Sequence, residues 1–256
     1  MDTMVSLRVE RLGAVARMVL DRPPLNVLDT VTLCELDATF AELDTDPGVK
    51  VALLTGAGRA FCAGVDVADH TGDRVVPMLD AFHGLIRRML DLDLTIVAAV
   101  NGAALGGGCE LLLGCDVVLA SATAKIGQPE IRLGVFPPIA AALLPRRIGP
   151  QAAANLLLSG CTIDANEAWR IGLVNHVCRP AELAGAALDY ANGLARLSRP
   201  VLRLTKQALR DGYRLGTDSA LDRADVLYRH ELMRLHDASE GIAAFLEKRE
   251  PVWKEA

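Results

Sequence analysis

The stretch LGGGCELLLGCD, residues 105–116, places three glycines directly before an apolar run that carries one carboxylate, Glu110. Glycine destabilises a helix interior by roughly 0.8–1 kcal/mol per residue relative to alanine, so three glycines suit a helix start better. There they let the backbone approach a ligand, and the first N–H groups have no partner inside the helix. The stretch therefore predicts a place that holds negative charge. A tight turn required only for packing and a phosphate-binding loop are the alternatives.

A second glycine-bearing turn follows another apolar run. The stretch TGAGRAFCAGVDV, residues 55–67, comes directly after a strand predicted over residues 49–55. Its glycines again allow the backbone to approach a ligand closely. Two such turns, each after a strand, can supply two backbone N–H groups to one oxygen, which is the geometry of an oxyanion hole.

Two glutamates occupy unusual settings. Glu110 lies in an apolar run, where a carboxylate is costly unless it is paired or functional. The alternative for Glu110 is a glutamate in the first turn of a helix that accepts hydrogen bonds from the N–H groups there. Glu130, in IGQPEIRLGVFPP at residues 126–138, follows Pro129, and its alternative is a surface pair with Arg132. Two glutamates that converge on one pocket can perform general acid–base chemistry on a water molecule.

The apolar pattern predicts an α/β fold. Short apolar runs predict strands at residues 14–20, 49–55, 95–100 and 116–120, and amphipathic runs predict helices at 31–44, 77–90 and 105–113. Because the strands lack polar alternation, we expect a sheet covered on both faces. After about residue 145 nearly every segment is predicted helical, with Gly160, Gly172 and Gly193 between the helices. We expect this helical part to pack on the α/β body or on a neighbouring subunit.

The bulk composition limits the classes of partner and compartment. The chain has 256 residues and a net charge of −5, which favours neither nucleic acid nor an anionic membrane as its main partner. Six cysteines without a Cys-x-x-Cys pair suggest reduced thiols, and we expect a cytoplasmic protein without a signal peptide or membrane span. The five histidines show no metal-ligand spacing, so no metal is expected.

Six motifs resemble, in order and spacing, the enoyl-CoA hydratase/isomerase (crotonase) superfamily. They are LDRPPLNVLD (20–29), LLTGAGRAFCAGVDV (53–67), AAVNGAALGGGCELLLGCDVVLA (98–120), IGQPEIRLGVFP (126–137), IGLVN (171–175) and AFLEKREPVW (244–253). The resemblance implies an α/β spiral of ββα turns over residues 1–195. It also implies a C-terminal helical region, residues 196–256, that drives formation of homotrimers or of homohexamers built as dimers of trimers.

The resemblance assigns roles to the residues singled out above. It implies that the N–H groups of Val65 and Gly107 polarise the thioester carbonyl of an acyl-CoA. Hydratases of the superfamily carry glutamates at the positions of Glu110 and Glu130, whereas other members often keep one or neither. Both glutamates together favour an enoyl-CoA hydratase that adds water across the 2,3 double bond.

The resemblance also implies how coenzyme A is held, with the CoA thioester as substrate and no permanently bound cofactor. The CoA-binding positions fall on Arg59, Ala63, Val65, Asp66, Val67, Phe245 and Lys248. Phe245 and Lys248 would reach the adenine and its phosphate from an adjacent subunit; for Lys248, a solvated helix end is the alternative. We expect most of a basic row, residues 199, 203, 206, 210 and 214, to be paired or solvated.

One segment departs from the common pattern. GVFPPIAAALLPRRIG, residues 134–149, stands where common hydratases have a PGAGG-type turn. With VDVADH (65–70) and MLDAFHGLI (78–86), it looks more like the branch that hydrates a cyclic dienoyl-CoA in anaerobic aromatic degradation. His70 and His83 are candidates for that acyl pocket, or else ordinary surface histidines. An enoyl-CoA isomerase, a ring-opening acyl-CoA hydrolase and a non-catalytic acyl-CoA-binding protein are the competing functions.

Overall fold

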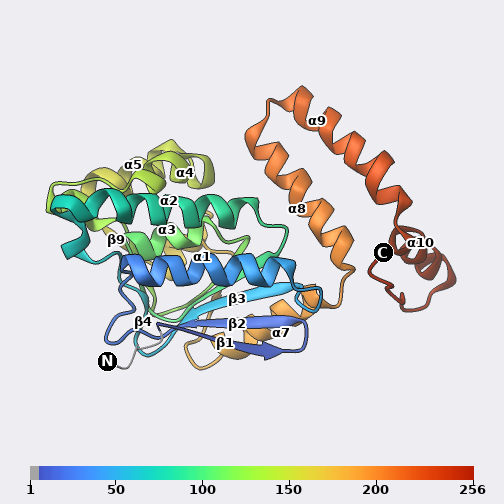
Figure 1. The fold of residues 1–256 in the computed structure, drawn as a ribbon, viewed down its shortest axis with the longest axis horizontal. Coiled ribbons are helices and arrows are strands. Elements are labelled where there is room, and N and C mark those ends of the chain that lie inside the picture. The colour runs from blue at the N-terminus through green and yellow to red at the C-terminus, as the bar shows by residue number, and fades with distance from the viewer. Residues whose placement is uncertain (1–5) are drawn as a thin grey trace.

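A repeated ββα unit builds the α/β body of the protein (Figure 1). The computed structural model describes residues 6–256. In the three units between residues 51 and 148, a strand of a larger sheet is followed by a strand of a smaller sheet and then by helix, whereas both strands of the first unit belong to the larger sheet. The larger sheet has the order β1-β2-β3-β5-β7-β10, with bounds Leu7–Leu12, Val15–Leu20, Val51–Gly56, Thr95–Val100, Val117–Ser121 and His176–Cys178. The smaller sheet has the order β4-β6-β8-β9, with bounds Ala60–Cys62, Ala103–Leu105, Lys125–Gly127 and Thr162–Asp164.

The α-helices of the body cover both faces of the larger sheet. They are α1 (Thr30–Thr45), α2 (Val75–Asp91), α3 (Gly107–Leu113), α4 (Pro138–Ile148), α5 (Pro150–Ser159), α6 (Ala165–Arg170) and α7 (Leu183–Ala195). In β3, Ala52 and Leu54 pack in the cluster that includes α1 and α2, whereas Val51 and Leu53 pack with α7. Side chains of a strand alternate between the two faces of the sheet, so this one apolar run contributes side chains to two hydrophobic clusters. The predicted strands and the covered sheet are confirmed.

The start of α3 differs from the prediction. The helix begins at Gly107 rather than at residue 105, because Leu105 is the last residue of β6. Between them Gly106 has φ +52°, a conformation that glycine adopts without the penalty of a side chain. Gly193, predicted to separate helices, lies inside α7.

The C-terminal helices lie to one side of the body (Figure 1). They are α8 (Arg199–Arg214), α9 (Thr217–Val226) and α10 (His236–Glu247), and a π-helical turn, Leu227–Glu231, continues α9. The boundary predicted between residues 195 and 196 falls between α7 and α8, and the division into a spiral core and a C-terminal helical region stays a prediction. No helix within residues 6–256 is both long and apolar enough to cross a membrane.

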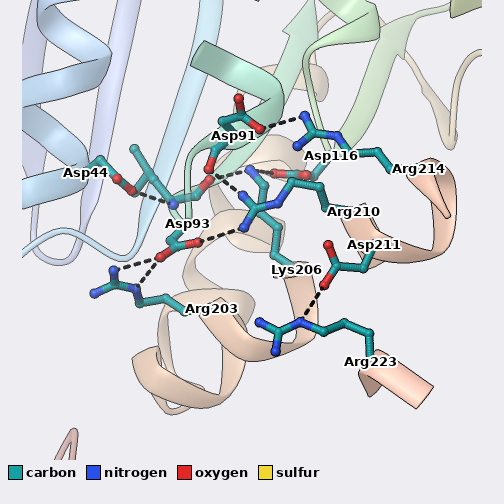
Figure 2. A network of polar contacts seen from close by, with 11 residues as sticks. Asp44, Asp91, Asp93, Asp116, Arg203, Lys206, Arg210, Asp211, Arg214 and Arg223 are labelled. Carbon is teal, nitrogen blue, oxygen red and sulfur yellow. Dashed lines mark hydrogen bonds and ion pairs between the residues drawn. The ribbon is translucent and has the colours of Figure 1, made fainter. Parts of the chain in front are cut away.

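Ion pairs hold α8 to the body (Figure 2). Lys206 donates to Asp116 at 2.8 Å and to the Leu94 carbonyl at 2.6 Å, and Arg203 donates to Asp93 at 2.8 Å. Lys206 is only 8% exposed and so is largely shielded from solvent, whereas its partner Asp116 stays accessible. Farther along α8, the last two residues of the basic row reach Asp91 and Asp93. The expectation that this row is mostly paired is confirmed.

Candidate active site

A cavity of about 290 Å³ opens at the start of α3. The loop after β4, the short 3-10 helix η1 (Val67–His70), α2, α3 and the stretch 129–139 line it. Its wall is mostly apolar and includes Met78 and Phe82 of α2 and Phe136. The polar side chains on the wall are those of His70, Thr71, His83, Glu110 and Glu130. An apolar cavity with a few convergent polar groups is typical of a small-molecule site.

Each of the three consecutive glycines is required by a different neighbour. A β-carbon on Gly106 would lie 2.4 Å from Oε1 of Glu130, and one on Gly107 would lie 2.7 Å from Cγ2 of Val65. A β-carbon on Gly108 would lie 2.1 Å from a backbone carbonyl oxygen of β4. At Gly108 the neighbour is backbone, so the approach of α3 to β4 excludes a side chain there. At Gly106 and Gly107 a side chain would require Glu130 or Val65 to shift.

Two backbone amides lie next to each other at this point. In the loop after β4, Leu28 donates to the Gly64 carbonyl at 2.9 Å, and Asp66 donates to the Leu28 carbonyl at 2.8 Å. These bonds fix the peptide of Val65 from both sides. A β-carbon on Gly107 would lie 3.3 Å from the Val65 nitrogen. Within residues 6–256, the N–H groups of Val65 and Gly107 have no hydrogen-bond acceptor, which leaves both available to one oxygen.

Glu110 is a buried carboxyl group that accepts from the backbone at the start of α4. It is 4% exposed, and its Oε1 accepts a hydrogen bond from the Ala140 N–H at 2.8 Å. Burial raises the pKa of Glu110 to about 7; the charge of Glu130 adds to the rise and the Ala140 N–H opposes it. Ala140 lies in the segment that departs from the common turn, so the start of α4 supplies a donor there.

Glu130 stands on the short 3-10 helix η3 (Pro129–Leu133), which follows β8. With the amide nitrogen of the fully buried Gln128 turned toward it, that nitrogen lies 3.1 Å from both carboxylate oxygens. Burial raises the pKa of Glu130, while its own backbone N–H and the charge of His70 act to lower it. Glu130 lines the cavity, and in the described part of the chain no ion pair joins it to Arg132.

The structure brings most of the predicted residues together. The cavity is lined by Ala63, Val65, Val67, Gly107, Glu110 and Glu130. Asp66 does not line it; its carboxylate accepts from the Ala68 N–H at 3.0 Å and so caps η1.

Besides Asp66, three predicted CoA-binding residues lie outside the cavity. Arg59 is exposed in the turn before β4, and Lys248 is exposed directly after α10. Phe245 is 83% exposed on α10, which lies away from α3 in Figure 1. A single chain therefore does not bring Phe245 and Lys248 to the glutamates, and their role stays a prediction that requires a second subunit.

The sequence analysis missed two partners of the glutamates. Gln128 lay inside a quoted motif without a role, and a polar residue two positions before Glu130 was the only available signal. The Ala140 N–H carried no signal, because any residue other than proline offers the same donor.

The chain resembles known proteins over nearly its whole length. It matches the enoyl-CoA hydratase/isomerase family over residues 10–256. The chain belongs to this family. It is 40% identical to the cyclohexa-1,5-dienecarbonyl-CoA hydratase of Thauera aromatica, over 96% of this chain and 95% of that one. It is 36% identical to the short-chain-enoyl-CoA hydratase of Clostridium acetobutylicum, over 94% of each chain.

Solved structures from the family share the fold. The crystal structure of an enoyl-CoA hydratase from Bacillus anthracis superposes with a TM-score of 0.94 at 31% identity, over 98% of this chain and all of that one. The resemblance proposed from the six motifs and the ββα spiral are therefore confirmed.

Proposed function

We propose that the protein is an enoyl-CoA hydratase that uses Glu110 and Glu130 on either side of one water molecule. The observation that carries the proposal is the convergence of two carboxyl groups and two unpaired backbone N–H groups on one cavity. An isomerase requires one proton-transferring carboxyl group, whereas water addition requires one group to take a proton and another to give one.

In this reaction the thioester oxygen accepts from the N–H groups of Val65 and Gly107. The oxygen of water bonds to C3, its proton passes to one carboxylate, and the electron pair of the double bond moves to the thioester oxygen as an enolate. The second carboxyl group then protonates C2, and the carbonyl re-forms. The amides are fixed before the charge develops, so they stabilise the enolate without reorganisation.

The ionisation of the pair suits this exchange. Two nearby carboxyl groups share their protons, and the pair titrates as a unit. Burial raises the pKa of Glu110 to about 7, so this group is partly protonated near neutral pH, and burial raises the pKa of Glu130 as well. A pair of this kind can carry a proton in the neutral range, where one carboxyl group can accept while the other donates.

We also propose a cyclic dienoyl group as the acyl substrate. The similarity to the Thauera aromatica hydratase supports this substrate, as does the cavity wall. Apolar side chains of Leu133, Val135, Phe136 and the start of α4 line the cavity. Such a wall fits an apolar ring.

Binding of the CoA moiety by a neighbouring subunit belongs to the same proposal. Apolar side chains stand exposed along the C-terminal helices: Leu209, Tyr213, Leu221, Tyr228, Ile242, Phe245 and Leu246. Exposed apolar area of this extent favours association, and we propose homotrimers or hexamers in which Phe245 and Lys248 reach the CoA of the next subunit. All six cysteines are free, which supports a cytoplasmic location.

The proposal is tested with purified protein, crotonyl-CoA and cyclohexa-1,5-diene-1-carbonyl-CoA, with products identified by mass spectrometry. We expect a product heavier by one water, formed fastest from the cyclic substrate. Free CoA would indicate a hydrolase, a shifted double bond at unchanged mass an isomerase, and binding without turnover a non-catalytic protein.

A further inference from the structure

A fully buried amide lies beside Glu130, and the hydration chemistry above does not use it. Gln128 is 0% exposed and stands between the last residue of β8 and the first residue of η3. It does not belong to the cavity wall formed by the described residues. Burial of an amide costs free energy unless its N–H groups reach acceptors. The partner of this amide therefore shows what the glutamine is for.

The contacts of the amide select one orientation and one partner. With the amide nitrogen turned toward Glu130, that nitrogen lies 3.1 Å from Oε1 and 3.1 Å from Oε2. In the opposite orientation the amide oxygen would face two acceptors, and the orientation of an amide is assigned from such neighbours. Because the two distances are equal, the donor lies between the two oxygens. The contact therefore constrains the plane of the carboxylate as well as its distance.

Further contacts fix the carboxylate against α3. A β-carbon on Gly106 would lie 2.4 Å from Oε1 of Glu130, so the carboxylate lies directly against the glycine before α3. Gly106 in turn donates to the Gly127 carbonyl at 2.9 Å, which ties the start of α3 to the end of β8. The Gln128 side chain is also a hydrogen-bond partner of the Cys109 thiol on α3. Glu130 is thus held between Gln128 and the start of α3 and still lines the cavity.

We propose that Gln128 is a positioning residue of the active site: its amide donates to both oxygens of Glu130 and holds that carboxylate at the angle from which it meets the water molecule. This inference rests on the proposed function, because it assigns the support of one of the two glutamates. It separates the two glutamates by their donors. Glu110 accepts from the backbone of α4, whereas Glu130 accepts from a side chain, which a substitution can remove.

The titratable groups on the elements packed around Glu130 stay in place when Gln128 is replaced. They are Glu110 and Cys109 of α3, His70 of η1, His83 of α2 and Arg132 of η3. Gln128 is neutral, so Gln128→Met keeps every one of these charges. A difference in Glu130 between wild type and this variant therefore reports the hydrogen bond.

The first test observes the amide itself. The chain has three glutamines, at positions 128, 151 and 207. In deuterated protein labelled with ¹⁵N-glutamine, nuclear magnetic resonance resolves three side-chain amides. The pair of signals that Gln151→Asn and Gln207→Asn both leave in place belongs to Gln128. We expect an amide proton of Gln128 to shift as Glu130 ionises, because a carboxylate is a stronger acceptor than a carboxylic acid.

Two comparisons complete this titration. Glu130→Gln should abolish the pH-dependent shift of the Gln128 amide, since the ionising acceptor is gone. Gln151, exposed on α5, is the internal control and should show no such transition in either protein. An amide proton of Gln128 that does not shift with pH in the wild type, or that shifts equally in Glu130→Gln, overturns the proposal.

A double-mutant cycle tests the link to catalysis. Gln128→Met keeps the length of the side chain and removes the donor. We expect it to lower kcat about 10²-fold with little change in acyl-CoA affinity, because the carboxylate is misplaced. In a Glu130→Gln background the same substitution should lower kcat by less than about 3-fold, since the group that Gln128 positions is already lost. An equal loss in both backgrounds would show a purely structural role and overturn the proposal.

The outcomes stay distinct from those of the proposed function. A wild-type protein that hydrates no enoyl-CoA overturns the proposed function, and the amide titration still decides whether Gln128 holds Glu130. If Gln128→Met does not fold, the titrations of wild type and Glu130→Gln decide the inference, because neither requires that variant.

Discussion

Burial of the Glu110 carboxyl group affects both proton transfer in the active site and the stability of the folded protein. The residue is 4% exposed, and the Ala140 N–H donates a hydrogen bond to it. Burial holds its proton to about pH 7, where an ordinary glutamate is fully ionised. A group whose pKa lies near the working pH can accept and donate a proton at similar free-energy cost.

Each glutamate should be required for turnover. We expect Glu110→Gln and Glu130→Gln each to lower kcat by about 10²–10⁴-fold, because the amide cannot exchange a proton. Acyl-CoA affinity should change little, since glutamine keeps the shape and the oxygen that accepts from Ala140. Steady-state kinetics and CoA-thioester binding measure the two effects. A single variant with near wild-type kcat would remove that residue from the mechanism.

The raised pKa of Glu110 also has a consequence for stability. The folded protein holds this proton more tightly than the unfolded chain, so the native state loses stability as pH rises from about 4.5 through about 7. Glutamine does not ionise. Glu110→Gln should therefore raise the free energy of unfolding by roughly 1–3 kcal/mol at pH 8 and have little effect at pH 4.5. Thermal unfolding at fixed protein concentration tests this, and an equal effect at both pH values would contradict it.

At the scale of the element, the start of α3 combines close packing with two free donors. The β4 loop and the first turn of α3 approach until a β-carbon at Gly107 would lie 2.7 Å from Val65 Cγ2. This contact complicates any substitution of Gly107, because a loss of activity can arise from the clash as well as from the lost N–H.

A background of Val65→Ala separates the two causes. Val65→Ala keeps its backbone N–H and should keep most activity. In that background, Gly107→Ala and Gly107→Pro both add a β-carbon, but only proline removes the N–H. Proline is tolerated at the first residue of a helix, so α3 should still form. We expect the proline variant to be about 10²–10³-fold slower in kcat than the alanine variant. Equal rates, with intact circular dichroism and oligomer, would exclude the N–H of Gly107 from the oxyanion site.

How far an element can be predicted depends on where its partners lie in the sequence. The strands β3 and β5 are continuous apolar runs. Strands buried on both faces have this pattern, so they can be recognised from the sequence. The strand β1 is mostly exposed, and β6 has three residues, so neither produces such a run. The pair of glutamates was predictable as a motif. The donor to Glu110 lies 30 residues farther along the chain and is a backbone group, which only the fold can bring there.

At the scale of the whole molecule, the C-terminal region is attached to the body yet leaves its apolar surface uncovered. The tail closes on the turn between α7 and α8 and on the start of α8. Trp253 donates to the Arg196 carbonyl at 2.8 Å, and Glu255 accepts from the Arg199 N–H at 2.7 Å. Phe245 nevertheless stands 83% exposed on α10, and α10 lies away from α3 in Figure 1. This arrangement favours an active site completed by a neighbouring subunit.

Subunit mixing tests shared sites directly. Phe245→Ala/Lys248→Ala chains should bind acyl-CoA weakly, and Glu110→Gln chains should bind it without turnover. In mixed oligomers, an intact cavity meets an intact α10 in about a quarter of the sites if each site uses one neighbour. We expect co-refolded or co-expressed mixtures to regain activity that neither parent has. An inactive mixture, with mixed oligomers demonstrated by mass spectrometry, would place the CoA site within one chain.

The most direct measurement is the fate of solvent oxygen during turnover in H₂¹⁸O. With an enoyl-CoA substrate, we expect the wild-type protein to place one ¹⁸O in a hydroxyl group on the carbon β to an intact thioester, and both glutamine variants to lose this incorporation in step with kcat. Label in a free carboxylic acid, or a product without label, would contradict water addition by the Glu110–Glu130 pair.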